Sequence, residues 1–379
     1  MNEIALEEKG LRLRLPDGEA AYFNYFWLRD NCATAFDAET RERTFDILAE
    51  PDDLRAARAR VDGDDLVVEW TGDGHESRYA LSWLAGWARG AGNSDSADVG
   101  RRLWRGDHLQ RMCRVSFESV LGSGVVEWAE ALLRDGIALV DGLPDSDDAL
   151  ERLAGRLGHI TPSCFGRYFD VRREANPINL AYTSRALELH TDLPSEEFAP
   201  GVQLLHCRAN EVISGGESLF VDGAAVAEDF RMSHPREFAL LSETLVPFRQ
   251  EHEMYDTRAR QRVIEVDADG AVSGVTYSQH LADTFDLPQS LLDDYYPAFR
   301  RFGRLMQDSR YLLRFRLEAG QCVTFDNHRV VHGRTAFEAG GGRRHLRGCY
   351  LGRGEVRSSY RIYASGGVLS GAWEDVKVP

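Results

Sequence analysis

The chain has 379 residues, more than one typical domain, which predicts one large and one small domain. Its composition, 43% hydrophobic and 28% charged, is that of a globular protein with a sizeable apolar core. A net charge of −16 argues against nucleic acid and against an anionic membrane surface as partners, whereas a cationic small substrate is compatible with it.

No apolar run is long enough to span a bilayer, and the N-terminal sequence MNEIALEEKG is acidic and polar rather than signal-like. We therefore expect a cytoplasmic protein. The 6 cysteines lie far apart in the sequence and include no CxxC pair. This spacing predicts free thiols, mostly buried, rather than a disulfide framework.

Residues 1–90 are predicted to form a small β-rich domain. Leu11–Leu15 and Leu66–Trp70 alternate apolar and charged residues, which is the period of a half-buried strand. Residues 22–28 are aromatic-rich and favour a strand as well. The Gly/Ser/Asp-rich sequence GAGNSDSADVG follows and predicts a linker, which we set at residues 91–114.

Residues 115–379 are predicted to form the large domain, mainly β with flanking helices. Hydrophobic periodicity predicts four helices, at 117–135, 147–157, 225–245 and 289–307. Short apolar or alternating runs predict strands at 137–140, 201–206, 219–222, 312–317 and 322–325. Helices followed by many short strands are typical of a β-sandwich with a helical flank.

The strongest chemical signal is the stretch His190-Thr191-Asp192 together with the distant His332. Residues i and i+2 of a strand point to one face, so His190 and Asp192 are expected to reach one ion together. A third ligand from His332 would complete a facial triad, which suits Fe(II) and leaves positions open for a co-substrate and dioxygen.

An arginine supports this interpretation. Arg344 follows His332 by 12 residues, and a guanidinium fork on an adjacent strand is what the distal carboxylate of 2-oxoglutarate needs for a bidentate contact. The alternative is a pair of buried structural histidines beside a surface arginine. His252 and His280, in predicted loops, are weaker candidates for substrate contact.

Longer segments carry a family resemblance. In chain order, LHTDLP, GVQLLHC, GGESLFVDG, TFDNHRVVHGRTAFEAG and RRHLRGCYLGR resemble the γ-butyrobetaine and trimethyllysine dioxygenases, which belong to the Fe(II)/2-oxoglutarate group that includes taurine dioxygenase. The resemblance covers nearly the whole chain, because WLRDNC and its surroundings are similar to the small N-terminal domain of these enzymes. It implies a double-stranded β-helix (jelly roll) catalytic domain and a homodimer.

The same resemblance implies the reaction and the cofactor site. The expected reaction is hydroxylation of a small trimethylammonium-bearing acid similar to γ-butyrobetaine, with Fe(II), 2-oxoglutarate and O2, giving succinate and CO2. His190, Asp192 and His332 match the iron ligands. Arg344 and Ser218 match the residues that hold the 2-oxoglutarate C5 carboxylate, and Arg343 is the competing arginine.

The expected substrate pocket is aromatic. Tyr182 and Tyr350 match positions that form a cage around a trimethylammonium group, and Phe165 and Phe169 are expected to complete its walls. A quaternary ammonium group has no N–H, so aromatic faces are the contacts that can hold it. The alternative is that these four rings are ordinary core residues.

The N-terminal domain departs from the family pattern. The zinc site of these enzymes uses three cysteines and a histidine, whereas only Cys32 and His75 remain here. One cysteine and one histidine do not make a zinc site, so no N-terminal zinc is predicted.

The expected anion end of the pocket departs as well. Ser278 and Gln279 stand where the family has an Asn-Asn pair, and Arg347 stands where it has an acidic residue, while Asn179 is retained. These changes predict a different acidic head on the substrate, for instance the phosphonate of 2-(trimethylammonio)ethylphosphonate, unless they are ordinary drift. Two further alternatives are a sulfonate substrate without ammonium and a non-catalytic binding protein, and the presence of all three iron ligands argues against the latter.

Overall fold

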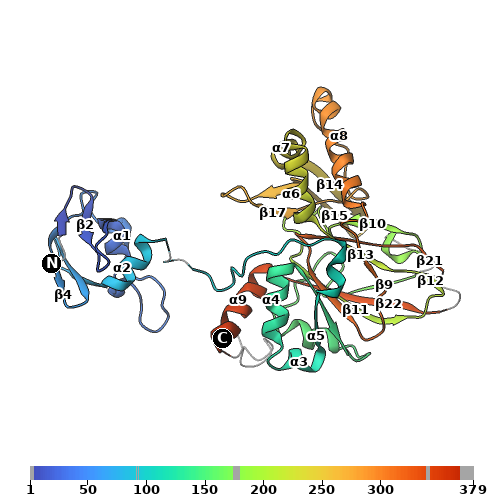
Figure 1. Cartoon of the computed structure of the whole chain (residues 1–379), viewed down its shortest axis with the longest axis horizontal. Coiled ribbons are helices and arrows are strands. Elements are labelled where there is room, and N and C mark those ends of the chain that lie inside the picture. The colour runs from blue at the N-terminus through green and yellow to red at the C-terminus, as the bar shows by residue number, and fades with distance from the viewer. Residues whose placement is uncertain (1–3, 91, 93, 174–179, 339–341, 368–379) are drawn as a thin grey trace. The chain divides into compact units, whose positions relative to one another are not determined.

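The computed structural model describes residues 4–90, 92, 94–173, 180–338 and 342–367, and the chain divides into two compact units, Met1–Asp95 and Ser96–Pro379 (Figure 1). Each unit has a hydrophobic core of its own. Within the described ranges, no helix is both long and apolar enough to cross a membrane.

Over its described residues, the first unit contains two three-stranded antiparallel sheets, two short α-helices and two 3-10 turns. The strands are β1 (Ile4–Leu6), β2 (Gly10–Arg14), β3 (Ala20–Asn24), β4 (Ala56–Asp62), β5 (Asp65–Trp70) and β6 (Glu76–Ala80). The helices are α1 (Tyr25–Asp30) and α2 (Leu81–Ala88), and the 3-10 turns are η1 (Ala33–Ala35) and η2 (Ile47–Ala49). The two predicted alternating strands are confirmed as β2 and β5.

The predicted strand at residues 22–28 is wrong beyond Asn24. The side chain of Asn24 accepts a hydrogen bond of 3.2 Å from the backbone N–H of Trp27 and thereby caps α1. An N-cap satisfies a donor that the first helical turn leaves free, so it favours a helix over continued strand pairing.

The second unit is a double-stranded β-helix, which confirms the predicted fold class. Its large sheet consists, in spatial order, of β7 (Cys113–Ser116), β8 (Ile137–Asp141), β19 (Cys322–Asp326), β11 (Val202–Asn210), β22 (Arg344–Leu351) and β9 (Phe169–Arg172). Its small sheet consists of β10 (Leu187–His190), β20 (Val330–Arg334), β13 (Ser218–Asp222) and β18 (Leu313–Phe315). The inner faces of the two sheets share one apolar cluster, which includes Leu205 and Leu346 from the large sheet and Phe220 from the small one.

Three two-stranded ribbons extend this framework. They are β12 (Ser214–Gly215) with β21 (Phe337–Glu338), β14 (Val246–His252) with β15 (Tyr255–Gln261), and β16 (Ile264–Val266) with β17 (Val272–Val275). The β14–β15 hairpin contributes a side chain to the cavity described below.

Helices cover the framework in two groups (Figure 1). The first group, α3 (Phe117–Leu121), α4 (Val125–Asp135), α5 (Ala149–Ala154) and α9 (Arg353–Ala364), shares an apolar core with outward side chains of the large sheet, such as Leu204 and Cys349. The second group, α6 (Gly223–Ser233), α7 (Pro235–Glu243) and α8 (Gln289–Met306), has a separate core with residues of the smaller sheet and the ribbons.

Two predicted helices are each divided in the structure. The predicted helix 117–135 is interrupted between α3 and α4 by Gly122 and Gly124, which flank Ser123. The predicted helix 225–245 is divided at His234-Pro235, where α6 ends and α7 begins. Proline lacks an N–H and is favoured in the first helical turn, so α7 begins there as a new helix.

The predicted linker 91–114 is too long, because the second unit already begins at Ser96. Trp104 is buried, and its backbone N–H donates to the carboxylate of Asp222 at 3.0 Å. Its indole N–H donates to the backbone oxygen of Asp135 at 2.7 Å. The segment is thus tied to the rest of the second unit by buried polar contacts, which composition alone does not reveal.

Candidate active site

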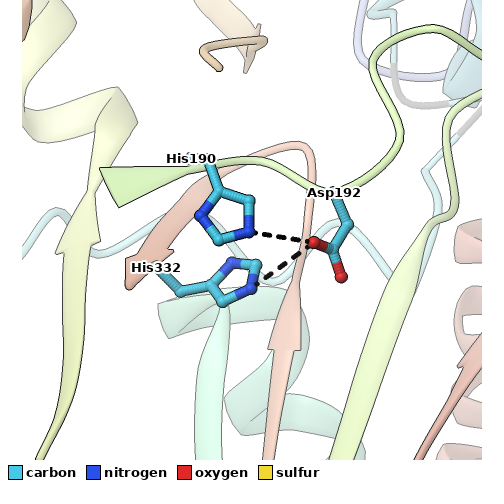
Figure 2. Close-up of side chains that lie close together, drawn as sticks. All are labelled: His190, Asp192 and His332. Atoms are coloured by element: carbon cyan, nitrogen blue, oxygen red, sulfur yellow. Dashed lines mark ion pairs between the residues drawn. The ribbon is translucent and has the colours of Figure 1, made fainter. Parts of the chain in front are cut away.

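Three polar side chains meet between β10 and β20. His190 ends β10, His332 lies within β20, and the two residues are opposite each other in the antiparallel pair. Nε2 of His190 lies 3.2 Å from Oδ1 of Asp192, and Nε2 of His332 lies 3.6 Å from the same oxygen (Figure 2). One ligand atom from each residue lies within 4.8 Å of the other two, so all three can bind one ion.

Asp192 reaches this point by a route that differs from the prediction. The strand ends at His190, and Asp192 lies in the loop that follows rather than on the same strand face. Leu193, next in sequence, has φ of 53°, a left-handed conformation that is uncommon for a residue with a side chain. A turn therefore brings the carboxylate back beside the imidazole.

Hydrogen bonds hold the loop in this conformation. The amide oxygen of Asn327 accepts from the backbone N–H of Asp192 at 2.7 Å, and its Nδ2 donates to the backbone oxygen of Asp192 at 3.0 Å. Thr191 and Tyr277 exchange two further bonds, of 2.7 Å from Thr191 N to Tyr277 O and 3.0 Å from Tyr277 N to Thr191 Oγ1. The backbone on both sides of the carboxylate is thereby fixed.

The ring orientations suit metal binding. Nδ1 of His190 lies 2.8 Å from the backbone oxygen of Glu188, so Nδ1–H donates there and leaves the Nε2 lone pair directed at Asp192. The hydroxyl group of Tyr350 donates to Oδ2 of Asp192 at 2.7 Å and leaves Oδ1 for an ion.

The charge states suit it too. Burial, together with His190, lowers the pKa of His332 to about 3 against the opposing effect of Asp192, so this imidazole is neutral near pH 7. Burial acts to raise the pKa of Asp192, but His332, His190 and the Tyr350 hydroxyl outweigh it and hold the pKa well below its usual range. The neutral imidazole of His332 and the ionised carboxylate of Asp192 suit the donor set of a 2-His-1-carboxylate Fe(II) site. The residues fit the metal.

The three residues lie on the wall of a cavity with about 890 Å³ of empty volume, including its opening to solvent. Leu205, Phe220 and Leu346 line it and also belong to the inner apolar core. The cavity therefore lies between the two sheets, next to the core that fills the rest of that space.

Two buried arginines line one side of the cavity. Arg344 is 6% exposed and Arg334 is 5% exposed, and neither forms an ion pair with a carboxylate among the described residues. Ser218, also buried, lines the same cavity. Arg343 is absent from the lining and lies 3.6 Å from the carboxylate of Asp145. Two guanidinium groups without an acidic partner, beside a hydroxyl group, suit the carboxylate of 2-oxoglutarate.

Four aromatic rings contribute to the lining. Phe165, Phe169, Tyr182 and Tyr350 all face the same cavity as His190, Asp192 and His332. Phe169 and Tyr350 stack with ring centroids 5.0 Å apart. The ring of Phe165 contacts that of Tyr255 edge to face at 5.9 Å.

The predicted anion end is corrected by the structure, because Ser278, Gln279 and Arg347 do not line the cavity. Side chains of a strand alternate between faces, so Arg344, Leu346 and Tyr350 face the cavity while Arg347 points to the outer face, over Tyr168. Ser278 is fully buried with its hydroxyl 3.4 Å from Nδ1 of His280, and Gln279 is exposed. Asn179 lies outside the described residues.

Several lining residues were missed by the sequence analysis. They are Gln203, Gln250 and Arg334. His280, which was only a weaker candidate in the sequence, lines the cavity as well. The ring of His280 lies 4.9 Å from that of His190. Gln203 could have been found, because it alternates with Leu205 along the predicted strand at 201–206. Gln250 and His280 lie on a hairpin and a loop for which the sequence carries no such signal.

In the first unit, Cys32 and His75 lie close together, with Sγ 3.7 Å from Nε2. The hydroxyl group of Thr34 lies 3.1 Å from the same Nε2. Across the described ranges, the only group of three or more His, Cys, Asp or Glu residues placed to hold a metal is His190, Asp192 and His332. The absence of an N-terminal zinc stays a prediction.

Comparisons with known proteins agree with this site. Residues 105–350 match the model of the family described as taurine catabolism dioxygenase TauD, TfdA family. The chain is 38% identical over 361 residues to the γ-butyrobetaine dioxygenase of Pseudomonas sp. (strain AK-1), covering 92% of each chain. It is 30% identical over 361 residues to the γ-butyrobetaine dioxygenase of Homo sapiens, covering 91% of this chain and 92% of that one. It is 29% identical over 359 residues to the mitochondrial trimethyllysine dioxygenase of Rattus norvegicus, covering 90% of this chain and 82% of that one.

The chain belongs to the TauD/TfdA family of dioxygenases. It is an Fe(II)/2-oxoglutarate-dependent enzyme, and the triad fits that metal. Within the family it belongs with the γ-butyrobetaine and trimethyllysine dioxygenases, as the resemblance predicted.

Proposed function

We propose that the protein hydroxylates a small acid bearing a trimethylammonium group, with γ-butyrobetaine as the first candidate. Fe(II) is held by His190, Asp192 and His332, and the C5 carboxylate of 2-oxoglutarate by Arg344 and Ser218. The products are the hydroxylated acid, succinate and CO2. The γ-butyrobetaine dioxygenases similar to this chain support this substrate class.

The aromatic wall beside the triad carries the proposal. Tyr182, Tyr350, Phe165 and Phe169 line the cavity that the triad also lines. Because a trimethylammonium group cannot donate a hydrogen bond, it is recognised by aromatic faces and desolvated contacts. The net charge of −16 also favours the approach of a cation.

The protein's contribution to the reaction is orientation and exclusion of water. The bound iron and 2-oxoglutarate supply the oxidative chemistry with dioxygen. The aromatic wall holds the ammonium end, so that a methylene of the substrate chain lies near the metal, and the apolar residues Leu205, Phe220 and Leu346 keep the adjoining space dry. The fixed loop around Asp192 holds the carboxylate ligand in place.

A carboxylate is the better choice for the acidic end of the substrate. The alternative, 2-(trimethylammonio)ethylphosphonate, depended on Ser278, Gln279 and Arg347, and none of these lines the cavity. A sulfonate without ammonium would leave the aromatic wall without a function.

The test is succinate release with Fe(II), 2-oxoglutarate and oxygen, comparing γ-butyrobetaine, trimethyllysine, the phosphonate and taurine. We expect turnover with γ-butyrobetaine. Turnover confined to the phosphonate or to taurine would overturn the proposal. Turnover confined to trimethyllysine would replace γ-butyrobetaine with another small acid that bears a trimethylammonium group.

A pair of variants tests the aromatic wall. Tyr182→Leu removes one cavity ring, and we expect KM for the ammonium substrate to rise about tenfold, from the loss of about 1–2 kcal/mol of cation–π contact. Tyr296→Leu, which changes an exposed ring on α8, is the matched control. An unchanged KM in Tyr182→Leu would argue against the cage.

Assembly and location stay predictions. The resemblance implies a homodimer, which sedimentation velocity of the full chain would test directly. The cytoplasmic compartment would be tested by fractionation of the native host.

A further inference from the structure

Arg334 is a cavity residue whose guanidinium group binds backbone rather than a carboxylate. It follows His332 by two residues on β20. Its Nη1 donates to the backbone oxygen of Ala181 at 3.2 Å. Its Nη2 donates to the backbone oxygens of Thr183 and Arg185, each at 2.8 Å. One side chain therefore binds three carbonyl groups within a five-residue stretch.

That stretch, residues 180–185, carries Tyr182. It consists of the single turn η4 (Leu180–Tyr182) and a bend that leads into β10. Within the stretch, Thr183 N–H donates to the backbone oxygen of Leu180 at 3.1 Å, and the backbone oxygen of Ser184 accepts from the N–H of Phe337 at 3.1 Å. Irregular backbone cannot satisfy its carbonyl groups internally, and Arg334 provides donors for three of them, so this guanidinium contributes to the position of the stretch.

Arg334 also lies close to Arg344. The two guanidinium groups lie 5.0 and 5.4 Å from the centre of the same ring, that of Phe337. Burial, with the neighbouring charge of Arg344, lowers the pKa of Arg334 to about 10, and burial lowers the pKa of Arg344 to about 10 as well. Both groups are therefore still cations near neutral pH. Neither guanidinium group has an acidic partner among the described residues. Within that part of the chain, no carboxylate therefore offsets the repulsion between the two positive charges.

We infer that Arg334 is a positioning residue that couples binding of 2-oxoglutarate to the order of residues 180–185 and hence of Tyr182. This inference rests on the proposed function, in which Arg344 binds the C5 carboxylate. The negative charge of this carboxylate at Arg344 offsets the repulsion between the two arginines, and Arg334 then holds the three carbonyl groups more firmly. Because coupling is reciprocal, an ammonium substrate seated on Tyr182 also tightens 2-oxoglutarate.

Hydrogen–deuterium exchange of the full chain tests the first half of this coupling without turnover. The protein is loaded with Zn(II), which is redox-inert, and exchange in peptides covering residues 180–186 is followed with and without 2-oxoglutarate. We expect 2-oxoglutarate to slow this exchange about fivefold or more, the lower end of typical coupling between sites. No protection in the wild-type protein, under conditions in which calorimetry shows 2-oxoglutarate bound, would overturn the inference.

The decisive variant is Arg334→Lys, which keeps the positive charge but cannot reach three carbonyl groups with one planar fork. We expect protection of residues 180–186 to be lost while the Kd for 2-oxoglutarate changes little. Arg101→Lys is the matched control, because the guanidinium of Arg101 donates to the backbone oxygens of Val272 and Ser273, outside the cavity. Full protection in Arg334→Lys would overturn the inference, and if this variant fails to fold, the wild-type experiment still decides.

A second measurement tests the reciprocal half. Calorimetry with the Zn(II)-loaded protein gives the Kd for 2-oxoglutarate with and without γ-butyrobetaine. We expect γ-butyrobetaine to tighten 2-oxoglutarate about fivefold or more in the wild type and in Arg101→Lys, but not in Arg334→Lys. If γ-butyrobetaine does not bind the wild type, the proposed substrate is wrong. The positioning role of Arg334 is then tested by the exchange experiment alone. If the tightening persists in Arg334→Lys, the coupling does not pass through this residue.

Discussion

The hydroxyl group of Tyr350 donates a hydrogen bond of 2.7 Å to Oδ2 of Asp192, while its ring stacks on Phe169 with centroids 5.0 Å apart. Burial, with the nearby Asp192 charge, raises the pKa of Tyr350 well above its usual value, so the hydroxyl is a donor at any working pH. One residue therefore orients the carboxylate of Asp192 through its oxygen and forms part of the cavity wall through its ring face.

Two variants separate these roles. Tyr350→Phe removes the hydrogen bond and keeps the ring, so we expect Fe(II) affinity to fall about 10- to 100-fold, the usual cost of losing a partner of a metal ligand. KM for the ammonium substrate should change little. Tyr350→Leu should weaken both. The measurements are an anaerobic Fe(II) titration and steady-state kinetics at saturating iron. Unchanged iron affinity in Tyr350→Phe would contradict the assignment.

Asn327 supports the same ligand through the backbone. Its amide group bonds both the N–H and the backbone oxygen of Asp192, and its Nδ2 also donates to the backbone oxygen of Pro200 at 3.0 Å. In Asn327→Ala these buried groups lose their partners, so we expect a loss of about 1–3 kcal/mol in the free energy of unfolding and weaker Fe(II) binding. Urea denaturation and the iron titration measure the two effects.

Asn24→Ala is the matched control for Asn327→Ala. It removes the cap of α1 in the first unit and should cost about 1 kcal/mol of stability without affecting the iron titration. Iron binding that falls equally in both variants would show that the effect of Asn327 is general destabilisation.

The sequence predicted the fold class and, from ligand chemistry and the family resemblance, that His190, Asp192 and His332 lie together. Strand alternation did not predict how Asp192 reaches this group, because the residue lies in the loop after β10. The sequence also selected Arg344, which lines the cavity, over Arg343, which does not. The same alternation places Arg347 on the outer face, three positions after Arg344. The resemblance pointed to Arg347, and the two-residue period of β22 should have excluded it.

Other parts of the site depend on long-range contacts that no local pattern reveals. The turn that returns Asp192 to His190 is held by Asn327, which is 135 residues away in sequence. His280 and Gln250 reach the cavity from a loop and a hairpin whose positions follow from packing. The guanidinium of Arg334 forms hydrogen bonds with carbonyl groups about 150 residues earlier in the chain. Because every residue has a backbone carbonyl, no sequence pattern identifies these partners.

A buried ion pair holds the N-terminal segment of the catalytic unit. Arg329 is 3% exposed and Asp222 is 1% exposed, and Nη2 lies 2.8 Å from Oδ2. Arg329 also donates to the backbone oxygens of Arg134 and Arg102, at 2.8 and 2.7 Å. Arg329→Met leaves a buried carboxylate without its partner, so we expect a loss of about 3–5 kcal/mol in the free energy of unfolding.

Urea denaturation checks this prediction against Arg111→Met. Arg111 pairs with Asp107 at 2.7 Å, but both side chains are exposed, and such pairs contribute about 0–1 kcal/mol. A loss below about 1 kcal/mol in Arg329→Met would mean that the pair is replaceable by apolar packing.

His206 makes the stability of the protein depend on pH. It is 1% exposed, and neither ring nitrogen has a hydrogen-bond partner among the described residues. Burial, followed by the charge of Arg208, lowers the pKa of His206 to about 4 from the usual 6.5. The other titratable groups that act on it are Asp145, His345 and Arg347. The folded protein thus keeps this imidazole neutral under conditions in which the unfolded chain protonates it.

The sign follows from proton binding. Between about pH 6.5 and pH 4 the unfolded chain binds more protons at this position than the folded protein does, so the free energy of unfolding falls as the pH falls. At pH 5 the contribution of His206 is on the order of 2 kcal/mol. His206→Leu removes the titrating group and fills a similar volume. In this variant we expect the difference in unfolding free energy between pH 7.5 and pH 5 to be smaller by about 2 kcal/mol. Urea denaturation of the metal-free protein at both pH values measures this difference. Other titrating groups contribute equally to both proteins, so an identical pH difference in His206→Leu would mean that His206 is protonated in the folded protein as readily as in the unfolded chain.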